Sequence, residues 1–147
     1  MGLGDQHGLA ATFTVNSPSD VNDASPGNGI CETAPGNAVC TLRAAIQEAN
    51  ALTGNDIINL PALPPPNAYV LTLGAVLEIS SNLIINGGGA ATTIIDGNGS
   101  LRPTAGVLRI AVAGIATISG VAARNGSFTF GTGGIQNDGT LTLSRWR

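Results

Sequence analysis

Short pieces in which apolar and polar residues alternate follow one another along the chain after Gly54. In residues 77–79 (Leu-Glu-Ile) and 108–110 (Leu-Arg-Ile), two aliphatic side chains flank a charged one. This alternation is typical of a strand with one buried face. The pattern therefore predicts a series of short strands separated by turns, at residues 56–60, 69–73, 76–79, 83–86, 93–96, 107–110, 116–119, 121–124, 134–137 and 141–144.

The region before Gly54 has a different pattern. Residues 12–16 alternate as a half-buried strand does, and a turn-rich segment over residues 17–29 follows. Residues 41–51 then carry apolar side chains at helical spacing, with Thr41 as a candidate N-cap. The pattern predicts one amphipathic helix whose apolar stripe is Leu42, Ala45, Ile46 and Ala49, and whose water-facing side chains are Arg43, Gln47 and Glu48.

The spacing of the strands indicates how they are arranged. Asn-Gly turns, taken alone, favour antiparallel hairpins and a sandwich. However, residues 116–120 recur in character at residues 141–144, about 25 residues later, with two strands between. Residues 83–86 precede residue 116 by a somewhat longer interval, which a loop at residues 99–106 accommodates. The predicted fold class is all-β, a right-handed parallel β-helix (solenoid) with an N-terminal α-helical cap over its first coil.

Length and charge narrow the class of protein. The chain has 147 residues, 43% of them hydrophobic, which suits one domain with a core. Its organisation is predicted as a leader remnant or tail (1–11), a capping region (12–55) and β-helix coils (56–147). Lysine is absent and the six arginines are scattered, so we expect no nucleic-acid partner. No apolar run is long enough for a membrane helix, so we expect no membrane insertion.

Cys31 and Cys40 are the only cysteines, nine positions apart in a Pro-, Gly- and Asn-rich stretch. Two thiols are too few for a zinc site, and the single His7 is remote. A disulfide is the favoured interpretation, and it implies an oxidising compartment. The alternative is a pair of small buried hydrophobic side chains.

Several of these segments together resemble a known family. Residues 13–16, 20–23 and 26–29, Cys31, residues 40–50 and residues 57–61 look like the N-terminal region of CSLREA-type proteins. Its motif Cys-Ser-Leu-Arg-Glu-Ala reads Cys-Thr-Leu-Arg-Ala-Ala at residues 40–45, with Ala44 in place of the acidic residue. The resemblance implies a large secreted or surface bacterial protein with a parallel β-helix like that of polymorphic outer-membrane proteins and filamentous adhesins.

The same resemblance implies a structural or adhesive role without a known reaction. No second cap can be read near residues 144–147, so the predicted last coil is open. Open strand edges and exposed aliphatic side chains mark association sites. We therefore expect either a longer solenoid or a homo-oligomer formed through the C-terminal coil end.

Oxygen-bearing side chains gather in the turn-rich segment. Asp20, Asn22, Asp23 and Asn28 are candidate ligands of a structural Ca²⁺, which prefers oxygen donors. The EF-hand pattern is incomplete, since Ala24 and Pro26 stand where ligands are expected. The alternative is a loop of Asx-turns that satisfies its own backbone.

Two alternative functions place different demands on the sequence. A polysaccharide lyase or hydrolase needs clustered carboxylates, and a lyase also needs a base. The strand region offers only candidates that are far apart in the sequence: Asp56, Glu78, Asp96, Asp138, Arg109 and Arg124. No catalytic residue and no cofactor is therefore predicted. A glycan-binding module could present outward threonines such as Thr72, Thr117 and Thr142, although threonine is also a favourable strand residue.

Overall fold

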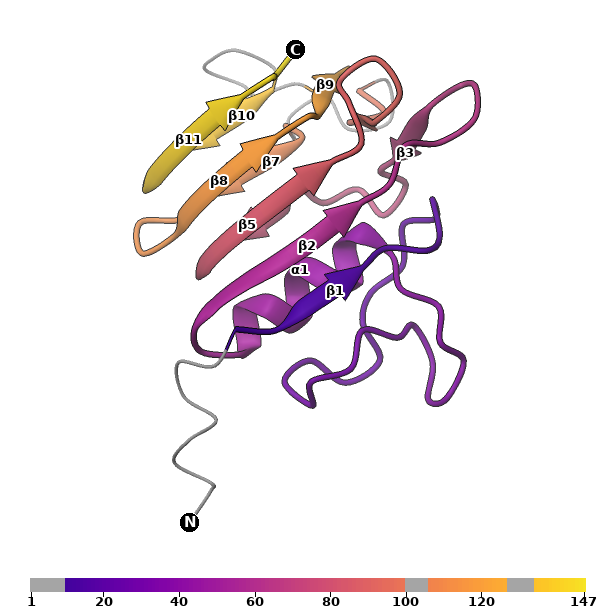
Figure 1. The fold of residues 1–147 in the computed structure, drawn as a ribbon, viewed down its shortest axis with the longest axis vertical. Coiled ribbons are helices and arrows are strands. Elements are labelled where there is room, and N and C mark those ends of the chain that lie inside the picture. The colour runs from indigo at the N-terminus through magenta and orange to yellow at the C-terminus, as the bar shows by residue number, and fades with distance from the viewer. Residues whose placement is uncertain (1–9, 100–105, 127–133) are drawn as a thin grey trace.

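The computed structural model describes residues 10–99, 106–126 and 134–147. Its largest element is a five-stranded parallel sheet, in which the strands follow chain order from one edge to the other (Figure 1). Each of the ten predicted strand-like pieces after Gly54 overlaps an observed strand. The strands of this sheet are β1 (Thr12–Thr14), β2 (Asn55–Leu60), β5 (Asn82–Gly87), β8 (Ile115–Ser119) and β11 (Thr140–Ser144).

Two three-stranded parallel sheets complete the β structure of the described residues. The first contains β4 (Leu77–Ile79), β7 (Leu108–Ile110) and β10 (Ile135–Asn137). The second contains β3 (Ala68–Val70), β6 (Ile94–Asp96) and β9 (Ala122–Arg124). Every pairing between these strands is parallel.

The predicted fold class, an all-β right-handed parallel β-helix, is wrong. The described residues form eleven short strands in three small parallel sheets plus one helix, with no closed coil or solenoid among them. The strands of the two smaller sheets are only three residues long, and irregular segments separate the sheets. The sequence before Gly54 also adds a long loop and a helix that no repeat predicts. The spacing of the strands correctly indicated that the partners are parallel, but it wrongly indicated that the strands close into a coil.

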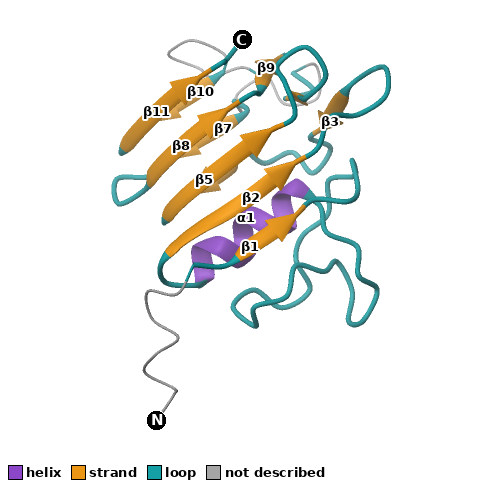
Figure 2. Cartoon of the chain, in the orientation of Figure 1, coloured by secondary structure: helices purple, strands orange, loops and turns teal. Residues whose placement is uncertain are grey.

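The helix α1 (Leu42–Ala51) begins where Thr41 caps it: the Thr41 hydroxyl accepts a hydrogen bond from the Ala44 amide at 3.1 Å. The helix lies alongside β1 and β2 (Figure 2) and contacts both β2 and β4. Its predicted apolar stripe is buried: Leu42, Ala45, Ile46 and Ala49 are at most 2% exposed.

Aliphatic side chains at equivalent positions of neighbouring strands form the core. Ile58, Ile85 and Ile118 are in register across β2, β5 and β8, and all three are fully buried. Parallel strands lie about 4.8 Å apart, so these side chains contact one another directly. The register therefore produces one continuous apolar row beneath the large sheet.

Two glycines let the chain pack closely where β5 and β8 end. A Cβ atom on Gly87 would lie 2.3 Å from the Gly120 carbonyl oxygen, inside van der Waals contact. Gly120 has φ +66°, a conformation that side chains disfavour. Only glycine fits both positions, so the two segments are in backbone contact at that end of the sheet.

Candidate functional site

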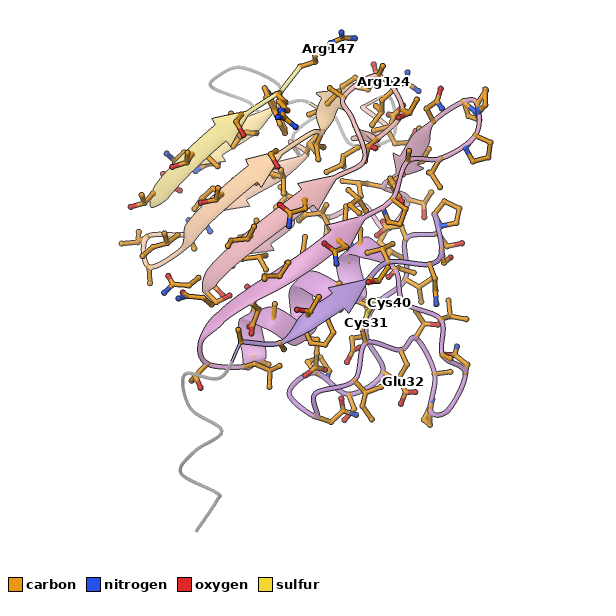
Figure 3. All side chains as sticks on the ribbon, in the orientation of Figure 1. Cys31, Glu32, Cys40, Arg124 and Arg147 are labelled. Carbon is orange, nitrogen blue, oxygen red and sulfur yellow. A yellow bond between two sulfur atoms is a disulfide. The ribbon has the colours of Figure 1, made fainter. Side chains whose placement is uncertain are left out.

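The predicted disulfide is present. Cys31 and Cys40 are joined, with their Cα atoms 5.1 Å apart. Figure 3 shows the pair beside the start of α1, at the end of the molecule opposite the C-terminal strands. The bridge fixes the loop over residues 31–40 directly before the helix N-cap.

Arg43 and Asp20 form a buried ion pair. The Arg43 Nε atom lies 2.5 Å from Asp20 Oδ1, and both side chains are nearly inaccessible to solvent, at 6% and 2% exposed. Arg43 also donates to the carbonyl of Ala75 at 2.8 Å. Asp20 Oδ2 accepts the backbone amides of Thr72 and Leu73. The pair therefore ties the N-terminal loop and α1 to the segment between β3 and β4, so the expectation that Arg43 faces water is wrong.

Glu48 is a second buried charge that the helical pattern placed in water. Its Oε2 atom accepts the amides of Gly27 and Gly29, each at 2.8 Å. Its Oε1 atom is buried and has no hydrogen-bond partner within the described residues. Burial raises the pKa of Glu48, the two amides oppose this shift, and the neighbouring Asp23 carboxylate adds to it. Two glycines ahead of a helical carboxylate are the sequence signal that could have located this contact.

The four predicted calcium ligands serve separate partners. Asp20 binds Arg43, Asn22 accepts from Gln47, and Asn28 caps its own turn at Ile30. Asp23 accepts the amides of Ser25 and Glu32. Among the described residues, no three His, Cys, Asp or Glu side chains are grouped to hold a metal ion. The calcium site stays a prediction, which a melting curve with and without chelator would test.

The environment of Glu48 predicts a pH-dependent stability. A carboxyl whose folded pKa lies above its unfolded value of 4.5 destabilises the fold as pH rises from that value through the folded pKa. Glu48→Gln keeps an oxygen for Gly27 and Gly29 and places an amide donor beside Asp23. We expect this variant to be more stable than the parent at pH 7, by on the order of 1 kcal/mol, and equal to it near pH 4.

Thermal unfolding at both pH values checks this expectation. Glu78→Gln is the control, because its side chain is 47% exposed and should change stability little at either pH. A Glu48→Gln variant whose melting temperature at pH 7 is equal to or lower than that of the parent would contradict this prediction, because the ionised Glu48 would then not destabilise the fold.

The carboxylates that polysaccharide chemistry would require are engaged in ion pairs or buried. Arg109 lies between Glu78 and Asp138, with Nη1 2.5 Å from Glu78 and Nε 3.1 Å from Asp138. Hydrogen bonds from Arg109 to Glu78 and Asp138 raise the pKa of Arg109. This row of charges spans β4, β7 and the turn after β10.

The other two carboxylates lie elsewhere. Burial opposes ionisation of Asp96, but hydrogen bonds from the Asn98 amide, Arg124 and Asn125 hold the pKa of Asp96 below its usual value. Asp56 is fully buried and accepts the Ala11 amide at 2.9 Å, and burial raises the pKa of Asp56. The structure therefore groups Glu78 with Asp138 through an arginine and leaves the other two apart.

The threonines that a glycan-binding face would use do not form one row. Thr117 and Thr142 are register partners on β8 and β11, whereas Thr72 lies after β3 and donates its amide to Asp20. Ile84 occupies the matching position on β5. Two aligned threonines do not make a regular threonine face.

Among the described residues, the aliphatic core is least covered at the C-terminal strands. Leu143 continues the row formed by Ile58, Ile85 and Ile118, but it is 38% exposed whereas those residues are buried. Leu141 and Ile135 are partly buried at the same end. β11 and β10 each lie at one edge of their sheet (Figure 1). This edge is the candidate interface.

Comparisons of the chain with protein-family models, with characterised proteins and with solved structures found no match. The resemblance to CSLREA-type proteins therefore stays a prediction. Within the described part of the chain, no helix has both the length and the apolar character to cross a membrane.

Proposed function

We propose that the chain is a non-enzymatic structural or adhesive module of an exported protein, and that it self-associates through the C-terminal edges of its sheets. The observation that carries this proposal is the exposure of Leu143 at the end of an otherwise buried aliphatic row. The disulfide between Cys31 and Cys40 supports an oxidising compartment.

A second copy of the chain is the occupant that this edge favours. Residues 140–144 read Thr-Leu-Thr-Leu-Ser and carry no charge, so two copies of β11 can pair without repulsion. Proteins that avoid edge pairing usually place charges or proline on such a strand. A two-fold axis would pair the two β11 strands in antiparallel fashion and bring Leu141 and Leu143 of both copies together.

Leu143→Lys tests the proposal by placing a charge in the contact. We expect the parent chain to be dimeric at micromolar concentration and the variant to be monomeric, with at least about tenfold weaker association. Light scattering coupled to size-exclusion chromatography measures both. Ile30→Lys is the matched control, because Ile30 is 53% exposed in the N-terminal loop and should leave the dimer intact. A parent chain that stays monomeric at 100-fold higher concentration, or a control that dissociates equally, would contradict the proposal.

A further inference from the structure

A groove of about 470 Å³ lies where β5 and β8 end. It is lined on one side by the glycines of residues 87–89 together with Gly120, and by the C-terminal residues Arg145, Trp146 and Arg147, which are called its wall below. The volume falls within the range of about 300–1,000 Å³ that is usual for small-ligand sites. Ala90, Ala91 and Ser119 also line the groove, so this side of it is formed by glycines and small side chains.

The wall of the groove is held in place by the sheets. The Arg147 amide donates to the Val121 carbonyl at 3.2 Å, and the Ala123 amide donates to the Arg147 carbonyl at 3.0 Å. Trp146 is partly buried and packs against the apolar core. Arg147 is therefore positioned by backbone hydrogen bonds and Trp146 by the packing of its indole.

Two arginines that form no ion pair within the described residues line the groove. Of the five described arginines, Arg43, Arg109 and Arg124 each form an ion pair with a carboxylate. Arg145 and Arg147 have no such partner within the described residues, and no acidic side chain lines the groove. The chain as a whole carries a net charge of −3. Arg145 and Arg147 thus flank Trp146, the only tryptophan of the sequence, and all three residues line the groove.

We propose that this groove binds an acidic saccharide, with Arg145 and Arg147 holding its carboxylates and Trp146 packing against the apolar face of a sugar ring. Guanidinium groups match carboxylates geometrically through paired N–H donors. An indole presents a large flat apolar surface with one polar N–H. A uronic-acid oligosaccharide combines both features, a carboxylate on each ring and a C–H face. This inference goes beyond the proposed self-association and uses different residues from its test.

Trigalacturonate is the probe, and the fluorescence of Trp146 is the readout, because no other tryptophan contributes. We expect a saturable change below about 10 mM. The methyl-esterified trigalacturonide has the same rings without their charge and should bind at least about tenfold more weakly. Sodium sulfate tests an anion without a sugar ring and should give no saturable change.

Arg145→Gln and Arg147→Gln should each weaken trigalacturonate binding at least about tenfold. Arg109→Gln, an exposed arginine on another sheet, should leave binding unchanged. The Leu143→Lys variant is titrated in parallel, so that loss of association and loss of binding are separated. No saturable change with trigalacturonate, equal binding of the methyl ester or of sulfate, or parent-like affinity in both arginine variants would overturn the proposal.

Discussion

Arg43→Met should lower the free energy of unfolding by about 3–5 kcal/mol, more than loss of the disulfide. The substitution keeps an aliphatic chain of similar length but leaves Asp20 as a buried charge without its cation. It also leaves the Ala75 carbonyl without its donor. Urea denaturation followed by circular dichroism measures the loss.

A double-mutant cycle separates the ion pair from the packing. Asp20→Asn alone should also destabilise, because its oxygen accepts from Thr72 and Leu73 but its amide then faces Arg43. The double variant Asp20→Asn, Arg43→Met should lose clearly less unfolding free energy than the sum of the two single variants, since it leaves no buried charge without a partner. Arg109→Gln is the control, because its pairs are exposed and worth at most about 1 kcal/mol. A loss below about 1 kcal/mol for Arg43→Met would contradict this account.

Removal of the disulfide should have the second-largest effect. Cys31 and Cys40 are nine positions apart, and releasing a loop of this length lowers stability by about 2.7 kcal/mol through the entropy of the unfolded chain. The double variant Cys31→Ser, Cys40→Ser avoids a free thiol. Its free energy of unfolding, measured with urea, should be lower than that of the parent by this amount. The parent under reducing conditions should unfold at nearly the same urea concentration as the double variant.

Removal of the disulfide should destabilise the N-terminal loop first, because the bridge lies directly before the cap of α1. Hydrogen exchange should therefore rise in residues 20–40 before it rises in β5 or β8. Equal stability of the double variant and the oxidised parent would mean that packing alone holds the loop.

Local patterns predicted the helix and the strands well, because the periodicity of each element depends on residues that are close together in the sequence. The stripe from Leu42 to Ala49 and the cap at Thr41 predicted the helix, and alternation predicted the strands. The isolated cysteines predicted the disulfide. Closure into a β-helix was wrong, because spacing indicates which strands are partners but says nothing of how irregular connections run between sheets.

The buried charges could not be predicted from helical periodicity. Arg43 and Glu48 lie on the polar side of the stripe, and only contacts from distant segments remove them from water. The partners of Asp20 could not be predicted either, since Arg43 and Thr72 lie 23 and 52 positions away along the chain. The groove beside Trp146 depends on the close approach of Gly87 and Gly120, which lie 33 positions apart and show no local signal.

The position of the Asp20 carboxylate determines the order in which the chain can fold during synthesis. Its amide partner at Thr72 is 52 residues away, and the Ala75 carbonyl that Arg43 requires is 32 residues beyond that arginine. A nascent chain therefore cannot complete its N-terminal half until residues 72–76 have left the ribosome. Until then, α1 lacks the contacts that residues 72–76 provide.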